Sequence, residues 1–316
     1  MPLQRLLITG GSGFLGRLLT ARLAGQFEVH SLHRSGLGFQ ANSHQLDLRD
    51  DHAVRRMLSE LRPEIVIHTA ALSDIAAAET KPIDAIETNI NVASRVADAA
   101  CRSGASLVIA LSSVKAALPQ NTYGLSKALM ERCLFRLALD SPRTRILSLR
   151  LPNILDSPRS FFGDWMKMLE EHGKIVTKGY EMKRFACTAD GAADQIETLI
   201  LSRDFPPSGT LMPLTRAIRI KEAMLAFTKA HKCDFERRDS QFDTSREEAA
   251  IGLHEAPWTE KIEVHGRVLF HSTPGVEKAS PIAAQVDTTG AEFYSPQDCD
   301  ELVARLGPTS RVRNGE

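Results

Sequence analysis

The sequence predicts an α/β fold: a Rossmann-like, doubly wound parallel sheet with a smaller, interleaved C-terminal substrate-binding lobe. Three observations support this prediction. Short apolar runs alternate with helical stretches through the first half of the 316 residues. A glycine-rich turn follows the first of these runs, and the alternation weakens after Leu151. Strand–helix alternation of this period is typical of a parallel sheet that helices cover on both faces.

The expected elements of the first half follow one another at short intervals. Apolar runs predict strands at residues 6–9, 28–32, 45–47, 64–68, 106–111 and 145–150. Apolar side chains at helical spacing predict helices at residues 14–23, in a stretch ending at Pro63, from Pro82 to Gly104, and at 123–139. A proline such as Pro82 is tolerated in the first turn of a helix, where its missing N–H has no intrahelical partner.

The second half is less regular. Residues 161–172 and 190–202 are expected to be helical, and 208–213 to form a turn leading into a strand. We assign residues 1–158 and 184–213 to an NADP-binding Rossmann domain, 159–183 and 214–308 to the substrate-binding lobe, and 309–316 to a frayed tail. Sheets of this class bind ligands outside the carboxyl ends of their strands, so we expect the chemistry at that edge.

Composition excludes several classes of protein. The 39 Lys and Arg balance 39 Asp and Glu, whereas nucleic-acid binding normally needs a basic excess. No apolar run reaches the 18 or more residues that would span a bilayer, so we expect no membrane insertion. The five cysteines lie far apart without a CxxC pair, which fits the reducing cytoplasm. The histidines show no metal-binding spacing, so no metal is expected.

The glycine-rich turn is the clearest local signal. Gly10 permits a tight turn, Gly13 lets the backbone approach a pyrophosphate, and Gly16 allows close helix–sheet packing. The N-terminus of the following helix supplies unpaired N–H groups and a positive dipole to phosphates. A dinucleotide site is therefore predicted here, against the alternative of a merely structural turn. The predicted contacts of the turn are Gly10, Ser12, Gly13, Phe14, Leu15 and Gly16.

The end of the second strand bears on the choice of cofactor. Arg34 stands where an NAD site usually places an acid on the ribose 2′-OH, and a guanidinium there suits a 2′-phosphate. NADP is therefore favoured over NAD, and the alternative is that Arg34 is a solvated surface residue. Asp47 is a candidate for binding the adenine amino group. Asp50 or Asp51 could cap the N-terminus of the next helix, a role separate from the cofactor contact of Asp47.

Tyr123 and Lys127 lie four residues apart, on one face of the predicted helix. A nearby ammonium favours the phenolate, so the pair can act as acid and base. Ser112 and Ser113 end the preceding strand, where a hydroxyl could bond the same substrate oxygen. Together with the glycine turn, these residues indicate a dehydrogenase-type site. The alternative is a helix-surface tyrosine beside a capping serine.

The chain resembles the extended short-chain dehydrogenases, and within them the bacterial UDP-N-acetylglucosamine 4,6-dehydratases of polysaccharide biosynthesis. The stretches that carry the resemblance include TGGSGFLG (9–16), LDLRD (46–50), HTAALSDIAAAETKPIDAIETNINVAS (68–94), LSSVKAALPQNTYGLSKALME (111–131), RLPNILDSPRS (150–160) and YEMKRFACT (180–188). The resemblance covers roughly residues 4–306. It implies further cofactor contacts at Leu48, Ala70 and Ala71, and it suggests a homo-oligomer.

The resemblance also implies a mechanism. Tyr123, supported by Lys127, would take the proton of the sugar C4 hydroxyl while hydride passes to the nicotinamide, and Ser113 would bind O4. The 4-keto group acidifies the C5 proton, which Lys115 would abstract, although a lysine just past a strand is usually a solvated loop residue. In a dehydratase, an acid then protonates the departing C6 oxygen.

The sequence departs from the dehydratase pattern at that acid. The family places an aspartate between the serine and the lysine, but this chain has Val114, which cannot donate a proton. Ser73 and Pro152 also replace a lysine and a glycine of the pattern, and its SRGS turn reads SPRS here. By this comparison, the chain retains the residues for C4 oxidation and C5 deprotonation. Dehydration at C6 would be impaired or differently arranged. An epimerase or a keto-sugar reductase fits the retained residues better than a standard dehydratase.

Three residues of the second half are candidates for substrate binding. Asn153 follows a strand and could bond the nucleotide or sugar, although a turn asparagine is the plainer interpretation. The resemblance suggests that Arg184 contacts a diphosphate, which suits its guanidinium, and the alternative is an exposed salt bridge. Arg159 is a further phosphate candidate.

The leading hypothesis is therefore an NAD(P)-dependent nucleotide-sugar epimerase or dehydratase. It would act on a UDP-N-acetylhexosamine through a 4-keto intermediate. The alternatives are a reductase of a nucleotide 4-keto-sugar and a non-catalytic module that senses NADP. A binding module alone would need the glycine turn but would not need Ser113, Tyr123 and Lys127 in order.

Overall fold

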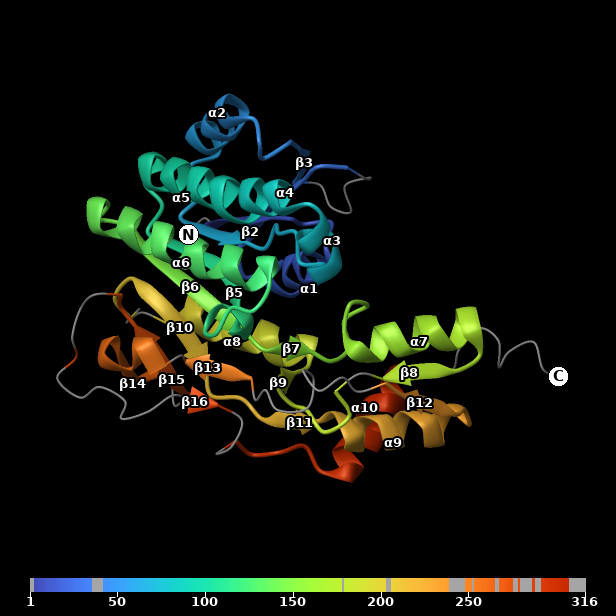
Figure 1. Cartoon of the computed structure of the whole chain (residues 1–316). Coiled ribbons are helices and arrows are strands. Elements are labelled where there is room, and N and C mark those ends of the chain that lie inside the picture. Colours follow the sequence, from blue (N-terminus) through green and yellow to red (C-terminus); the bar gives the residue numbers. More distant parts are fainter. Residues whose placement is uncertain are drawn as a thin grey trace. The chain divides into compact units, whose positions relative to one another are not determined.

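The computed structural model describes residues 3–35, 42–177, 179–202, 206–238, 248–251, 253–264, 267–274, 278, 286–287 and 291–306 (Figure 1). The chain forms two compact units. The first unit comprises Met1–Leu151, Ala193–Leu214 and Ala250–Gln285, and the second unit comprises Pro152–Ala192, Thr215–Ala249 and Val286–Glu316. The expected tail, residues 309–316, lies outside the described residues.

A nine-stranded sheet forms the centre of the first unit. Its strands stand in the order β14-β15-β10-β6-β5-β4-β1-β2-β3. Their bounds are β14 (Thr259–Val264), β15 (Arg267–Ser272), β10 (Gly209–Pro213), β6 (Arg145–Leu151), β5 (Leu107–Ser113), β4 (Ile65–His68), β1 (Arg5–Thr9), β2 (Glu28–His33) and β3 (Ser43–Gln45). The pairs from β10 to β3 are parallel, and β15 and β14 add two antiparallel pairs. This confirms the predicted fold class.

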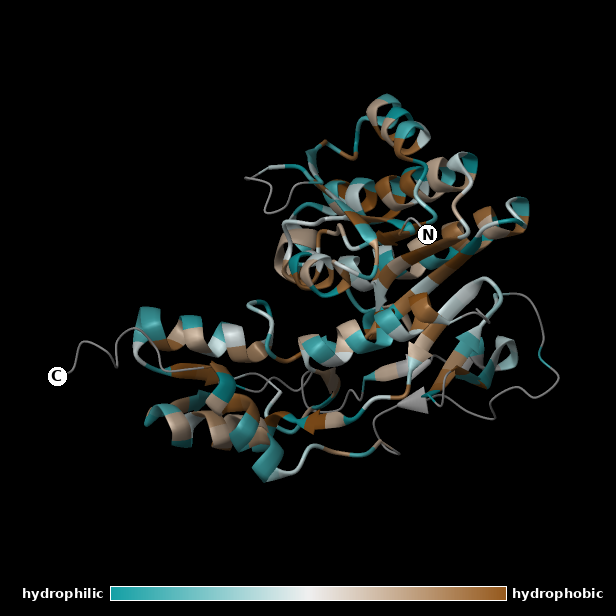
Figure 2. Cartoon of the chain, turned by 180° about the vertical axis from the view of Figure 1, so that it is seen from behind, coloured by the Kyte–Doolittle hydropathy of each residue, from teal (hydrophilic) through white to brown (hydrophobic). Residues whose placement is uncertain are grey.

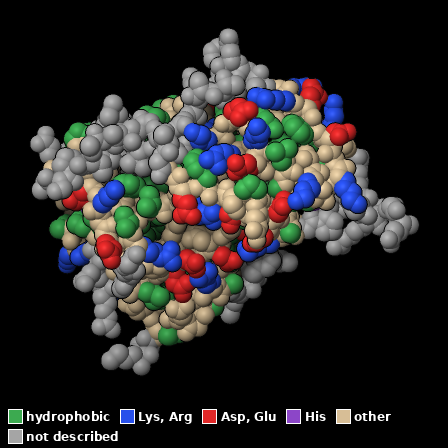
Figure 3. Space-filling model, turned by 90° about the horizontal axis from the view of Figure 1, so that it is seen from below, with side chains coloured by type: hydrophobic (Ala, Val, Ile, Leu, Met, Phe, Trp, Pro, Cys, Tyr) green, Lys and Arg blue, Asp and Glu red, His purple; other side chains and the backbone are tan. Residues whose placement is uncertain are grey.

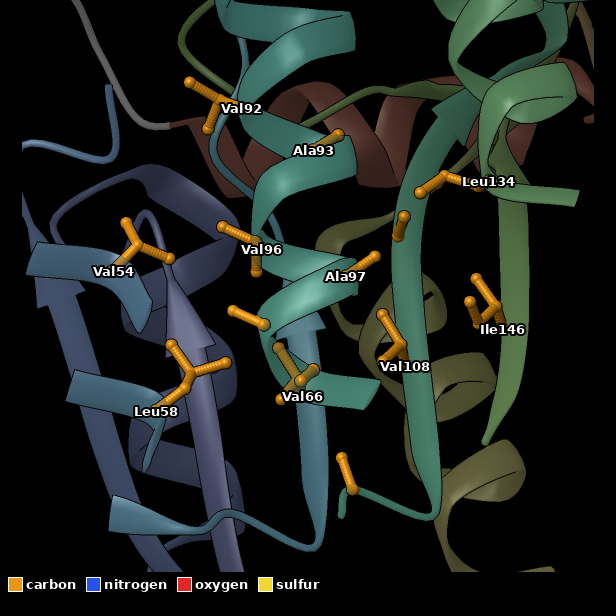
Figure 4. Close-up of a cluster of buried hydrophobic side chains, with 14 of the residues drawn as sticks. Val54, Leu58, Val66, Val92, Ala93, Val96, Ala97, Val108, Leu134 and Ile146 are labelled. Carbon is orange, nitrogen blue, oxygen red and sulfur yellow. The ribbon is translucent and has the colours of Figure 1, made fainter. Parts of the chain in front are cut away.

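Helices cover both faces of this sheet (Figure 4). The helices α2 (Asp51–Leu61), α5 (Val92–Ser103) and α6 (Thr122–Asp140) pack side by side, since α5 contacts both of the others. The helices α1 (Phe14–Leu23) and α8 (Ala189–Leu201) are joined by ion pairs of Arg22 with Asp194 and Glu197. Of the two N-cap candidates, Asp50 is the N-cap of α2 and accepts a hydrogen bond from Ala53 N, and Asp51 is the first residue of the helix.

The main core lies between α5 and the strands. Figure 4 shows Val96 and Ala97 of α5 facing Val66 of β4 and Val108 of β5. These side chains are at most 1% exposed, and full burial of a valine stabilises the fold by about 1.5–3 kcal/mol. Hydrophobic residues are concentrated on the strands, and polar residues on the outer helix surfaces (Figure 2). This packing fixes the carboxyl edge of the sheet, where the candidate site lies.

The long helix expected from Pro82 to Gly104 is interrupted. It consists of α4 (Pro82–Ile86), a π-helical turn η1 (Glu87–Asn91) and α5, which ends at its C-cap Gly104. A π turn inserts one residue into the helical ladder and often lies at a functional site. The short helix α3 (Ile75–Thr80) precedes α4.

Two differences from the expected arrangement concern the edges of the large sheet. Strand β3 runs from Ser43 to Gln45 rather than over residues 45–47. Leu46 N still donates a hydrogen bond to His33 O of β2 at 2.9 Å, and the Leu46 side chain packs against the main core. Strands β14 and β15 belong to the large sheet, although the sequence placed them in the substrate-binding lobe. Strand β15 pairs with β10, whose backbone groups would otherwise be left at a sheet edge.

The second unit has its own small sheets and core. Its strands are β7 (Asn153–Ile154), β8 (Ile175–Thr177), β9 (Lys183–Cys187), β11 (Ala217–Arg219) and β12 (Phe235–Arg237), and its helices are α7 (Phe161–His172), α9 (Ile220–His231) and α10 (Pro296–Leu306). Strands β11, β9 and β7 form one sheet, and β12 pairs with β8. Trp165 packs edge-on against Phe162 and Phe227, so it serves the core of this unit.

Three short elements complete the described chain: β13 (Ala249–Ile251), the 3-10 helix η3 (Leu253–Trp258) and β16 (Val286–Asp287). Lys and Arg side chains alternate with Asp and Glu on the face shown in Figure 3, in keeping with the balanced charge. Among the described residues, no helix is long and apolar enough to cross a membrane.

Candidate functional site

The turn between β1 and α1 is tight, and its backbone packs closely against the glycines. Gly10 has a φ of +72°, and Gly13 N donates a hydrogen bond to Gly10 O at 2.9 Å. A Cβ on Gly10 would lie 2.8 Å from Ala70 N, and one on Gly16 would lie 2.2 Å from Gly10 O. Neither position tolerates a side chain, because real Cβ atoms do not approach backbone this closely. The turn thus has the shape that a pyrophosphate requires at a helix N-terminus.

The carboxyl end of β4 lies beside this turn. His68 shares a hydrogen bond with Thr9 Oγ1 through Nδ1 at 2.8 Å, and Thr69 Oγ1 donates to Thr9 O at 2.7 Å. Burial, aided by the charge of Lys127, lowers the pKa of His68 to about 3, so the ring is neutral. These contacts place Ala70, a predicted cofactor contact, against Gly10.

Ser113 and Tyr123 meet at the carboxyl end of β5. Ser113 is the last residue of β5, and Tyr123 lies in the first turn of α6, whose N-cap is Asn121. The Ser113 hydroxyl interacts with the Tyr123 phenol. Burial raises the pKa of Tyr123 to about 12, and the interaction with Ser113 acts in the opposite direction. The structure therefore brings together the two hydroxyls that the sequence paired.

Lys127 lies one helical turn after Tyr123 and is 2% exposed. Its Nζ donates a hydrogen bond to Leu111 O at 2.8 Å, beside Ser112 and Ser113. Burial lowers the pKa of Lys127 to about 8, and the charge of Glu131 opposes this shift. The ammonium is thus mostly charged at neutral pH, which favours the phenolate of a neighbouring tyrosine.

The segment between β5 and α6 carries the remaining predicted residue. Val114, Lys115 and Ala116 form the 3-10 turn η2, and Lys115 N donates to Ser113 Oγ at 3.3 Å. Val114 is 1% exposed, so its side chain serves packing only. A Cβ on Gly124 would lie 2.6 Å from Lys115 O. The close approach of α6 to η2 thus places Lys115 near the start of the Tyr123 helix.

Asn89 is a residue that the sequence analysis missed. It is fully buried in the π turn η1. Its side chain accepts from Leu72 N at 2.8 Å and donates to Leu72 O at 3.1 Å and to Ser126 Oγ at 2.9 Å. Asn89 therefore connects the segment after β4 to the Tyr123–Lys127 helix. The only signal in the sequence is a polar residue on an otherwise apolar helix face.

The adenine side of the predicted cofactor site contains a second arginine. Asp47 accepts hydrogen bonds from Arg49 at 2.5–3.1 Å, and these bonds lower the pKa of Asp47 to about 2. Arg34 also acts on the Asp47 charge, and Gln45 Nε2 donates to Arg34 O at 3.2 Å. Arg34 and Asp47, two of the predicted cofactor contacts, therefore lie near each other, together with the unpredicted Arg49.

The three predicted substrate contacts all lie in the second unit. Asn153 Nδ2 donates to Phe185 O at 2.8 Å and to Glu248 Oε2 at 3.0 Å, so its amide is held within that unit. Arg184 Nη1 donates to Lys183 O at 3.0 Å. Arg159 is exposed in the turn before α7. No group of metal-ligating side chains is found within the described part of the chain.

A family comparison agrees with this geometry. The family model described as "Polysaccharide biosynthesis protein" matches residues 6–203, which is more than half of the chain. The chain belongs to this family. The residues that the family model matches include the glycine turn, the Ser113–Lys127 segment and Asn153.

Three curated relatives are similar to this family member over parts of their length. The probable polysaccharide biosynthesis protein EpsC of Bacillus subtilis is 26% identical over 207 residues, 60% of this chain and 34% of the relative. A UDP-glucose 4-epimerase of Rickettsia prowazekii is 27% identical over 61% of each chain. A UDP-N-acetylglucosamine 4,6-dehydratase (inverting) of Campylobacter jejuni is 30% identical over 54% of this chain and 55% of the relative. The chain thus spans a third to three fifths of these relatives.

Solved structures share the fold. Pen from Bacillus thuringiensis superposes with a TM-score of 0.81 at 20% identity, over 96% of this chain and 98% of that one. MoeE5 in complex with UDP-glucuronic acid and NAD has a TM-score of 0.68 at 18% identity, over 77% of this chain and 88% of that one. At these identities the likeness shows the fold alone.

Proposed function

We propose that the protein is an NAD(P)-dependent enzyme that oxidises C4 of a nucleoside-diphosphate sugar, with a UDP-N-acetylhexosamine as the substrate. The observation that carries this proposal is that Ser113 interacts with Tyr123 beside the buried Lys127, in the unit that carries the glycine turn. A purely binding role would not require an acid–base pair there. Relatives that act on UDP-glucose and UDP-N-acetylglucosamine support the substrate class.

In this mechanism each residue has a separate task. Ser113 holds the C4 oxygen, and Tyr123 takes the proton of the C4 hydroxyl, with the Lys127 charge stabilising the phenolate. A bound nicotinamide would accept the C4 hydride, and Gly10, Gly13 and Gly16 would admit its pyrophosphate. The proposed substrate contacts in the second unit are Asn153, Arg159 and Arg184. The proposed cofactor contacts also include Ser12, Phe14, Leu15, Asp47, Leu48, Ala70 and Ala71.

The fate of the 4-keto sugar depends on Lys115 and Val114. A keto group at C4 acidifies the C5 proton, and Lys115 is our candidate for its removal. Loss of the C6 oxygen needs an acid, and general acid catalysis contributes about 10²–10⁴-fold. Val114 cannot supply it. We therefore favour exchange or epimerisation at C5 over efficient dehydration, with reduction of a ready-made 4-keto sugar as the second candidate.

A proton NMR time course in D₂O tests the proposal, with UDP-N-acetylglucosamine, enzyme and NADP. Deuterium at C5 without a new C6 methyl signal is the expected result. The variant Lys115→Met is expected to lose this exchange while it still reduces the cofactor. A methyl signal at C6 would show that another group replaces the missing acid. No cofactor reduction with any nucleotide sugar would contradict the proposed oxidation and favour the reductase or the NADP-sensing module.

We further propose that NADP is preferred over NAD. Arg34 and the neighbouring Arg49 offer two guanidinium groups near the predicted ribose position, and guanidinium suits a phosphate dianion. Replacing Arg34 by alanine is expected to raise the KM for NADP about tenfold and leave the KM for NAD nearly unchanged. Steady-state kinetics with each cofactor measures this. Arg55→Ala is the control, because Arg55 pairs with Asp51 and Asp98 on α2 and α5. Equal changes for both cofactors would contradict the assignment.

Two further expectations are kept as proposals. We propose that the protein forms a homo-oligomer, and the exposed Ile83 of α4 with Leu125 and Leu129 of α6 offers apolar area for a second copy. We also propose that it acts in the cytoplasm, since all five cysteines are unpaired thiols.

A further inference from the structure

A fully buried ion cluster lies behind the candidate site. Arg150 of β6 is 1% exposed, and Glu131 of α6 and Glu255 of η3 are each 3% exposed. Arg150 donates to both oxygens of Glu131 at 3.0 and 2.7 Å, and to both oxygens of Glu255 at 2.8 and 2.7 Å. The guanidinium thus forms a bidentate contact with each of two carboxylates. Arg132, which is partly exposed, lies 3.8 Å from Glu255.

A buried ion cluster of this kind adds little to the stability of a fold. Taking charges out of water is costly, and apolar residues of similar volume often give an equal or more stable core. A buried ion cluster therefore suggests another role where it contacts functional residues. Glu131 makes two such connections.

The first connection runs to Ser113. Ser112 Oγ donates a hydrogen bond to Glu131 Oε1 at 2.5 Å. Ser112 also stands opposite Arg150 in the β5–β6 register. Ser113 is the next residue along the chain, so a fixed Ser112 fixes the backbone from which the Ser113 hydroxyl reaches Tyr123.

The second connection runs to Lys127. Glu131 follows Lys127 by four residues on α6, one helical turn away. Burial lowers the pKa of Lys127, and Glu131 is the charged group that opposes this shift. The other titratable groups of the packed elements are Tyr123 on the same helix, His68 of β4, which is neutral at ordinary pH, and Arg150 of β6, which is paired with Glu131 and Glu255. Glu131 is thus the carboxylate that supports the Lys127 charge.

We propose that Glu131, Arg150 and Glu255 form a positioning cluster for the active site. Glu131 fixes Ser113 through Ser112 and keeps Lys127 charged, and Glu255 holds Arg150 and Glu131 in place while adding a second negative charge. Glu255 lies outside the range 6–203 that the family model matches, so the C-terminal part of the chain contributes to the catalytic centre. The catalytic consequence rests on the function proposed above.

The direct test is the ionisation of Lys127 in the intact protein. Lysine labelled with ¹³C at Cε gives an NMR signal for each side chain, and the Lys127 signal is the one lost in Lys127→Arg. Removing a nearby negative charge favours the neutral amine. The titration midpoint of Lys127 is therefore expected to fall by about half a pH unit or more in Glu131→Gln, and by a smaller amount in Glu255→Gln.

Two further variants separate charge from shape. Glu255→Asp keeps the charge and is expected to keep the Lys127 midpoint, even if it lowers stability. Glu260→Gln is the control, because Glu260 lies on the following strand and pairs with Lys278, away from α6. An unchanged midpoint in Glu255→Gln, or an equal fall in Glu255→Asp, would overturn the proposal.

Kinetics provide a second readout. Loss of a negative charge favours the deprotonated forms of both Tyr123 and Lys127. The pH profile of cofactor reduction in Glu255→Gln is therefore expected to shift to lower pH on both limbs. A lower rate with an unmoved profile would indicate a structural role only and overturn the proposal. The NMR titration needs no substrate, so an inactive wild-type protein would refute the proposed function and leave the titration decisive.

Discussion

Replacing Tyr123 by phenylalanine is expected to lower turnover about 10²–10⁴-fold, because it removes the only group proposed to take the C4 proton. The ring and its place in the first turn of α6 are preserved. Cofactor affinity is therefore expected to change by less than about twofold. Turnover is measured as cofactor reduction with a nucleotide sugar, and affinity by the quenching of protein fluorescence on cofactor binding.

The control for this variant is Tyr294→Phe, which removes a phenol hydroxyl in the second unit and is expected to leave turnover unchanged. Full activity of Tyr123→Phe would show that another group carries the proton. A wild-type protein that binds NADP but turns over no nucleotide sugar would favour the NADP-sensing module.

Replacing Arg150 by leucine is expected to destabilise the protein by about 3–5 kcal/mol. The substitution leaves Glu131 and Glu255 buried side by side without their shared cation, and breaking a buried ion pair in this way has a cost of that size. Urea unfolding followed by circular dichroism measures the change. The fluorescence of Trp258 and Trp165 provides a second probe, since two units need not unfold together.

Two comparisons make this prediction specific. Arg136→Leu breaks an exposed pair with Asp140 on the same helix, and it is expected to cost at most about 1 kcal/mol. Replacing all three cluster residues by apolar ones is expected to recover much of the lost stability without restoring turnover. A midpoint for Arg150→Leu close to that of Arg136→Leu would contradict the assignment of a buried, mutually dependent cluster.

Local features were predictable because they depend on neighbouring residues. The glycine turn is specified by the backbone conformations that Gly10 and Gly16 allow, and the α6 helix by its apolar spacing and the Asn121 cap. The pairing of Tyr123 with Lys127 follows from helical geometry alone. Parallel strands meet at one edge of a sheet, so the sequence also predicted that Ser113 would lie beside them.

Other features depend on residues that only folding brings together. Glu255 reaches Arg150 across 105 residues, and no local pattern marks a glutamate that will be buried by a distant arginine. The π turn at Asn89 forms because that side chain has partners after β4 and on α6. Strands β14 and β15 joined the large sheet because β10 offered an edge, a fact invisible in their own weakly patterned sequence.

The sequence by itself thus determined the fold class, the glycine turn and the candidate acid–base residues, because each is encoded by short-range spacing and backbone preference. The tertiary structure alone decided what surrounds them. It placed Arg49 on Asp47, Asn89 between two site segments, and the Glu131–Arg150–Glu255 cluster behind Ser113 and Lys127. The physical reason is that a buried polar group is costly unless it forms a hydrogen bond or an ion pair. Which partner lies close enough depends on the packing of the whole unit.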